Sequence, residues 1–94
     1  MRRAAHLCRR DVNEPELVKL ARALGAQMER IHEPCDWLCG YRGLWTPVEV
    51  KTEDGTLTDG QEKFRERCVT YRTPFWVWRG ESDVLRCLMA RRSA

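Results

Sequence analysis

The sequence predicts a small α/β domain in which helices flank a mixed four-stranded sheet, in the order helix, three strands, helix, strand, helix. Helix-start signals occur at three places along the chain. Between the first two, short apolar stretches alternate with turn residues, which is typical of strands in an antiparallel meander. The length of 94 residues allows one domain, over residues 1–94, with a thin core.

The first helix is expected to begin at Asn13 and to run to about Leu24. Asn13 has the side chain of an N-cap, Pro15 suits the first turn, and Glu16 stands where a capping box needs an acid. Gly25 follows as the C-terminal stop signal. The chain before this helix is expected to form a loose basic arm over residues 1–12.

One acidic residue of this helix is expected to point inward. Glu14 lies at helical spacing from the apolar positions and so falls on the buried stripe, whereas Glu16 falls off it. The apolar stripe consists of Leu17, Val18, Ala21 and Leu24.

The remaining elements follow from turn and cap residues. A tight turn at 41–43 separates the second and third strands, Thr58 caps the second helix with Gln61 in its first turn, and Ser82 or Glu81 caps the last. The four expected strands are Gln27–His32, Cys35–Gly40, Leu44–Lys51 and Phe75–Trp78.

The charge composition favours phosphate as a partner only weakly. The chain carries 17 basic and 14 acidic residues, a net charge of +3, and all but three of the basic residues are arginines. Arginine offers two parallel hydrogen bonds to a phosphate. No apolar run approaches the ~18 residues of a membrane span or forms a signal peptide, so a cytoplasmic protein without a membrane partner is expected.

The five cysteines indicate a reducing compartment, because an odd number without a CxxC pair does not form a closed disulfide framework. They are interpreted as small core residues. The nearest zinc-like spacing is His32, Cys35 and Cys39, which keeps a zinc-stabilised interaction domain as one alternative.

Three charged residues stand where the chain is expected to be buried. Glu49 and Lys51 are two positions apart on one strand and therefore share a face, and Asp36 approaches Glu49 if the two strands are antiparallel neighbours. Two carboxylates and a backbone carbonyl form an oxygen site that suits Mg²⁺. The alternative is a surface hairpin that carries a Glu/Lys pair.

These residues belong to a longer pattern. The stretch from Asp11 to Leu88 resembles the small phage-type, stand-alone members of the VRR-NUC family within the PD-(D/E)XK nuclease superfamily. Cys35 separates the proline and aspartate that are adjacent in the family motif. The resemblance is carried by Asn13-Glu14, Leu17-Val18, Pro34-Cys35-Asp36, Val48-Glu49-Val50-Lys51, Leu57-Thr58 with Gln61, and Phe75-Trp76-Val77-Trp78.

The resemblance implies a PD-(D/E)XK nuclease-like fold of order αβββαβα and an enzyme that uses Mg²⁺ or Mn²⁺. Glu14 and Glu16 are two residues apart, and the inward stripe favours Glu14 as the helix acid. The implied roles are metal binding for Asp36, Glu49 and the Val50 backbone carbonyl, and catalysis for Lys51, with Gln61 orienting the water or the lysine and Glu14 completing the acidic cluster.

The expected function is therefore divalent-metal-dependent hydrolysis of DNA by an endonuclease, selective for branched or junction DNA in phage replication or recombination. The enzyme is expected to be a homodimer without a small-molecule cofactor, in the cytoplasm of a bacterial host if the chain is encoded by a phage. A non-catalytic DNA-binding module on a nuclease-like fold is the second alternative. The arginines expected to contact DNA are Arg2, Arg3, Arg9, Arg10, Arg91 and Arg92.

Overall fold

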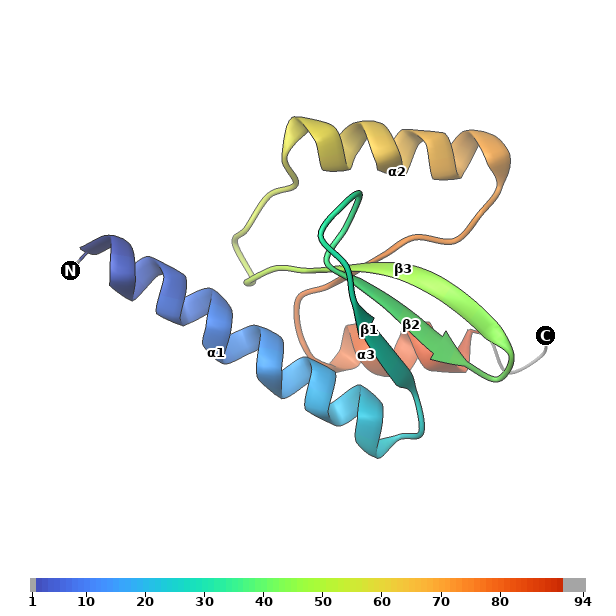
Figure 1. Cartoon of the computed structure of the whole chain (residues 1–94), viewed down its shortest axis with the longest axis horizontal. Coiled ribbons are helices and arrows are strands. Elements are labelled where there is room, and N and C mark those ends of the chain that lie inside the picture. The colour runs from blue at the N-terminus through green and yellow to red at the C-terminus, as the bar shows by residue number, and fades with distance from the viewer. Residues whose placement is uncertain (1, 91–94) are drawn as a thin grey trace.

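The computed structural model describes the backbone of residues 2–90 and the side chains of residues 13–90. The described chain forms three helices and four strands, in the predicted order (Figure 1). The elements are α1 (Arg2–Ala23), β1 (Gln27–Arg30), β2 (Trp37–Tyr41), β3 (Leu44–Val50), α2 (Asp59–Tyr71), β4 (Trp76–Trp78) and α3 (Glu81–Met89).

The strands form one mixed sheet in the order β1-β2-β3-β4. The first three strands pair antiparallel, as the short connections predict, and β4 then pairs parallel to β3. A parallel neighbour needs a crossover connection, and α2 provides it. Figure 1 shows α2 on one side of the sheet and α1 and α3 on the other.

The hydrophobic core lies between the sheet and the α1–α3 layer. Val48 and Val50 are buried there, and the side chain between them, Glu49, faces the opposite side, because successive strand residues alternate. Trp78 is fully buried in the same core, and Trp76 packs against it. Both tryptophans of β4 therefore contribute to this core, and Glu49 lies on the other face of the sheet, toward α2.

The cysteines behave as small core residues. Cys39 and Cys87 belong to the core cluster, and Cys35 and Cys68 are buried elsewhere. None of these four cysteines forms a disulfide bond within the part of the chain that the structure describes.

The predicted start of the first helix is wrong. The helix begins at Arg2, so Asn13 is not an N-cap and residues 2–12 belong to α1 instead of forming a loose arm. Alanine, leucine and arginine dominate residues 2–10, and these residues have high helix propensity, which lets the helix continue through Pro15. At the other end Leu24 lies beyond the last helical residue and is 41% exposed, outside the buried stripe.

The caps of the other two helices differ in outcome. Thr58 caps α2, as predicted, and forms a capping box with Gln61. The N-cap of α3 is Gly80 without a side-chain bond, so the predicted cap at Ser82 or Glu81 is wrong. The side chain that bonds to the backbone at the start of α3 is Asp83, whose carboxylate accepts from the Arg79 N–H at 2.7 Å.

All four strands are shorter than predicted. Lys51 lies after β3 and Phe75 before β4, while β1 and β2 are short because the chain turns early between them. The Ile31 N–H donates to the Asp36 carbonyl at 2.8 Å and closes the loop that joins β1 to β2. β1 therefore ends at Arg30 and β2 begins at Trp37. The loop places Asp36 directly before the first residue of β2, next to β3.

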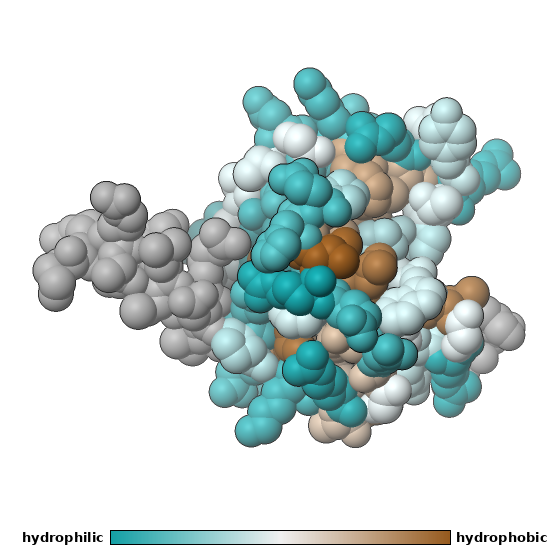
Figure 2. All heavy atoms as spheres, viewed as in Figure 1, coloured by the Kyte–Doolittle hydropathy of each residue, from teal (hydrophilic) through white to brown (hydrophobic). Residues whose placement is uncertain are grey.

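The visible surface over α2 is mostly hydrophilic, with a small hydrophobic area between that helix and the sheet (Figure 2). Among the described helices, none has both the length and the apolar composition that a membrane crossing requires.

Two glycines with open space around them test the backbone assignments: Gly43 in the β2–β3 turn and Gly60 in the first turn of α2. Gly43 has φ +84°, in the left-handed region, with open space around its Cα, while Gly60 lies in a helix with equally open space. We expect Gly43→Ala to lower the free energy of unfolding by about 1 kcal/mol because of backbone strain. Gly60→Ala is expected to raise it by about 0.5–1 kcal/mol. Urea denaturation measures both. A loss at Gly60 would contradict the helix assignment, and an unchanged stability at Gly43 would contradict the turn assignment.

Candidate active site

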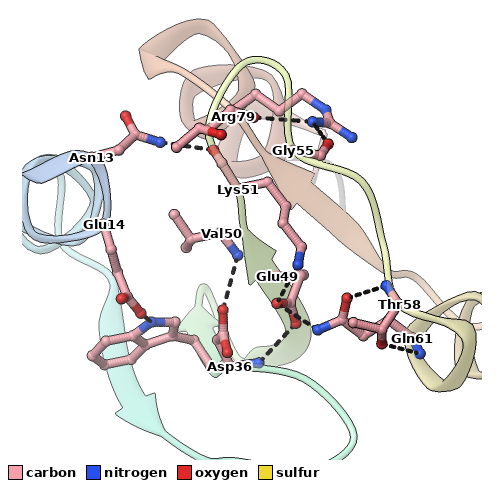
Figure 3. Close-up of polar contacts among 12 residues, drawn as sticks. Asn13, Glu14, Asp36, Glu49, Val50, Lys51, Gly55, Thr58, Gln61 and Arg79 are labelled. Carbon is pink, nitrogen blue, oxygen red and sulfur yellow. Dashed lines mark hydrogen bonds and ion pairs between the residues drawn. The ribbon is translucent and has the colours of Figure 1, made fainter. Parts of the chain in front are cut away.

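The centre of the candidate site is a fully buried carboxyl group on β3. Glu49 is 0% exposed, and three neighbours reach it from different parts of the chain (Figure 3). The Asp36 N–H donates to Glu49 Oε1 at 3.2 Å, and Gln61 Nε2 donates to Oε2 at 2.8 Å. Lys51 Nζ lies 3.7 Å from Oε2. Burial of a carboxyl group is costly unless such partners compensate it.

Asp36 and Glu49 hold each other in place through the backbone. The pairing of Trp37 with Val48 places the preceding residue, Asp36, beside Glu49. Asp36 donates its N–H to Glu49, and its own Oδ2 accepts the Val50 N–H at 3.4 Å. The two carboxyl groups therefore lie together at the end of the β2–β3 ladder, as the antiparallel pairing of these strands predicts.

Burial raises the pKa of Glu49 to about 7, and a hydrogen bond to the Asp36 carboxyl and repulsion by its charge act in the same direction. Lys51 opposes the shift without cancelling it. Among the described side chains, the ion-pair partner of this pair of carboxyl groups is Lys51, which contacts Glu49.

The backbone N–H and the backbone carbonyl of Lys51 are both hydrogen-bonded. Its N–H donates to the Trp78 carbonyl at 3.0 Å, and its own carbonyl accepts from Asn13 Nδ2 at 2.7 Å. The guanidinium of Arg79 donates to the carbonyls of Thr52 and Gly55 in the loop that follows. The lysine side chain is 11% exposed, and its backbone support comes from three elements, α1, β4 and the chain after β4.

Gln61 uses both ends of its amide. Its Oε1 accepts the Thr58 N–H at 2.8 Å as part of the α2 capping box, while its Nε2 donates to Glu49. Both amide ends are occupied, so in this geometry Gln61 orients the Glu49 carboxylate and the start of α2 together.

Glu14 faces inward from α1, as its place on the helical stripe predicts. Its partners are Trp37 and Arg30, which lie next to the Asp36–Glu49 pair. Its Oε2 accepts from Trp37 Nε1 at 2.5 Å and lies 3.3 Å from Arg30 Nη1. The Trp37 indole, whose ring lies 5.1 Å from the Arg30 guanidinium, thus links Glu14 to the core. Glu16 is exposed, so Glu14 is the acid that faces the sheet.

The donor set fits a hard divalent cation. Within the described side chains, no three His, Cys, Asp or Glu residues form a metal-binding group. The oxygen donors that lie together here are the carboxyl groups of Asp36 and Glu49. The Val50 N–H points to Asp36, and the carbonyl of a strand residue points to the same side as its N–H. Asp36, Glu49 and the Val50 carbonyl therefore offer oxygen ligands, which Mg²⁺ and Mn²⁺ prefer, beside a single ammonium group, that of Lys51.

The other expected sites have different outcomes. His32 is exposed whereas Cys35 and Cys39 are buried, and these three residues form no metal-binding group among the described side chains. The six arginines expected to contact DNA lie outside the described side chains.

Comparison with known proteins adds no relative. No protein-family model, curated protein or solved structure matches this chain.

Sequence reasoning missed three supporting residues, Asn13, Trp37 and Arg79. Asn13 is adjacent to Glu14 on α1, so the helix that presents the acid also presents the amide. Arg79 and Lys51 each follow a strand, and Val50 pairs with Trp78 in parallel register. A basic residue after each of two parallel strands is a signal that was present in the sequence. The Trp37–Glu14 contact has no comparable signal.

The raised pKa of Glu49 predicts how stability depends on pH in the metal-free protein. The folded protein binds a proton more tightly than the unfolded chain, so the free energy of unfolding should fall as pH rises from about 4.5 to about 7. Glu49→Gln should remove this part of the dependence. Urea denaturation in EDTA across this range measures it, and an unchanged slope in Glu49→Gln would contradict the assignment.

The Arg79 contacts predict a specific loss. We expect Arg79→Lys to lower the free energy of unfolding by about 1–2 kcal/mol, because an ammonium group does not span the carbonyls that the guanidinium joins. Amide exchange should accelerate in residues 51–58. The control is Arg65→Lys at an exposed ion pair, where a change within about 0.5 kcal/mol is expected. Equal effects of the two variants would contradict a stabilising role for the Arg79 bonds to the Thr52 and Gly55 carbonyls.

Proposed function

We propose that the protein is a divalent-metal-dependent endonuclease that hydrolyses phosphodiester bonds in DNA. The observation that carries the proposal is the fully buried Glu49 carboxyl, which contacts Asp36, Lys51 and Gln61 at one end of the sheet. A buried acid with a raised pKa, beside a second acid and a lysine, is typical of functional sites.

Asp36, Glu49 and the Val50 carbonyl are the proposed ligands of Mg²⁺ or Mn²⁺. When bound, such a cation supplies Lewis acidity toward a phosphodiester oxygen and lowers the pKa of a coordinated water. Lys51 supplies an ammonium group beside these ligands, where it offsets the negative charge that develops on the phosphate during hydrolysis. Gln61 holds the Glu49 carboxylate in position.

The topology supports the family resemblance as part of this proposal. The order αβββαβα, with β4 parallel to β3 and helices on both faces, is the arrangement that a PD-(D/E)XK nuclease fold implies. The segment Val48-Glu49-Val50-Lys51 has the expected alternation, with two buried valines on the core face and the acid on the other. Membership in the VRR-NUC family, and action on branched DNA in phage replication or recombination, belong to the same proposal.

We also propose a homodimer. Leu24, Leu85 and Met89 are all more than two-fifths exposed and line one cleft of about 180 Å³ between α3 and the β2–β3 turn. Exposed apolar patches of this kind mark interaction sites. A second copy of the chain would cover them and enlarge a thin core.

Cleavage of branched and linear DNA in Mg²⁺ or Mn²⁺ tests the proposed activity. We expect the wild-type protein to cut, and Lys51→Ala and Asp36→Ala each to lower the rate at least about 10²-fold, because the first removes the ammonium group at the reacting phosphate and the second removes a ligand of the cation. Lys51→Ala should still bind DNA. The control is Lys19→Ala, an exposed lysine on α1, which should cut at the wild-type rate.

Metal titration separates the roles of the two residues. Mn²⁺ binding, measured by calorimetry, should be lost in Asp36→Ala and retained in Lys51→Ala. Undiminished cutting by either variant would rule out the assignment. DNA binding without any metal-dependent cutting would instead favour the non-catalytic module.

A further inference from the structure

A polar groove adjoins the candidate active site on the α2 side of the sheet. It lies between the loop that joins β1 to β2 and the first three turns of α2, and its volume is about 440 Å³. Gln61 lines this groove and also donates to Glu49. The groove therefore begins where the buried carboxyl pair ends.

Two cations face the groove from α2. Lys63 and Arg67 are four residues apart, which places them on one side of the helix, and both line the groove. Among the described side chains, Lys63 has no ion pair, and the Arg67 guanidinium lies over the Phe64 ring at 5.7 Å. A guanidinium over an aromatic face keeps its N–H groups at its edge available to a phosphate. The groove has one carboxylate, that of Glu33, so its net charge favours an anion.

The opposite wall carries an aromatic group. His32 lies on the β1–β2 loop, is exposed, and lines the groove across from the helix. Imidazole rings stack on unpaired bases in proteins that bind single strands. Cations on one wall and a stacking ring on the other match the two parts of a nucleotide, its phosphate and its base.

The size of the groove favours a single strand over a duplex. A volume of 440 Å³ is within the range of pockets that hold one small organic molecule. Eight residues of a loop and a helix line it, and such a site encloses one nucleotide. In a duplex, the base stays paired and stacked and does not meet the His32 ring.

We propose that this groove binds one nucleotide of single-stranded DNA next to the phosphodiester at the candidate active site. Lys63 and Arg67 contact its backbone phosphate and His32 stacks on its base. The inference rests on the proposed function for the identity of the ligand as DNA, and it deepens that function: the preferred substrate has an unpaired segment beside the bond that is cut.

Salt-dependent binding tests the groove without cleavage. The probe is a fluorescein-labelled oligothymidylate, its binding followed by anisotropy in EDTA over a potassium chloride series. We expect Lys63→Gln and Arg67→Gln each to reduce the slope of log affinity against log salt by about 0.7, the value for one lost contact to a single strand. His32→Ala should lower affinity about fivefold or more at an unchanged slope.

Arg65→Gln is the matched control. Arg65 lies between the two groove cations in sequence, does not line the groove, and pairs with Glu62 at the surface. It loses the same charge from the same helix and should keep the wild-type slope. Wild-type slopes for Lys63→Gln and Arg67→Gln, or an equal loss for Arg65→Gln, would overturn the proposal. So would a hairpin duplex of equal nucleotide number that binds more tightly than the single strand.

Cleavage is scored separately, so that the two proposals fail independently. Metal-dependent cutting with unaltered binding by the groove variants overturns the groove and leaves the nuclease in place. Altered slopes with no cutting under any metal condition support the groove and overturn the nuclease.

Discussion

The burial of Glu49 is the constraint on which the organisation of this molecule depends. A carboxyl group with no exposed surface needs donors, and this one takes them from the loop before β2, from Lys51 directly after β3, and from the first turn of α2. These contacts specify how β2, β3 and α2 meet. The apolar layer on the opposite face of the sheet supplies the stability that lets a small domain carry such a group.

One face of β3 packs in the hydrophobic core, and the other face carries the polar groups of the candidate site. Val48 and Val50 pack against α1 and α3, while Glu49, and Lys51 after the strand, face the polar side. The backbone around Lys51 is anchored by Asn13 from α1 and by Arg79 from the chain after β4. The polar groups therefore stand on a rigid strand, and their positions depend on the core packing of the same residues, which is how accurate placement of a site is achieved.

Patterns of short range made most of the fold predictable. Alternation along 44–51 predicts which side chains share a face, and the Thr58–Gln61 spacing predicts the start of α2. The start of α1 was mispredicted because Asn13 and Pro15 resemble a cap, whereas the helix propensity of the residues before them prevails. The Arg79 contacts with the 52–55 loop, and the partners of Glu14, depend on strand register and on tertiary packing, which local patterns do not encode.

Gln61 couples the stability of the first turn of α2 to the environment of the Glu49 carboxyl group. α2 has few contacts with the sheet. Phe64 contacts Phe75, directly before β4, edge to face at 5.4 Å, and Cys68 is the buried residue of the helix. The amide that caps this helix also satisfies the buried acid. Fraying of the first turn of α2 therefore deprives Glu49 of a donor, and the charge of Glu49 acts on the same amide that caps the start of the helix. The amide protons of that turn are thus a built-in reporter of the ionisation state of the carboxyl pair.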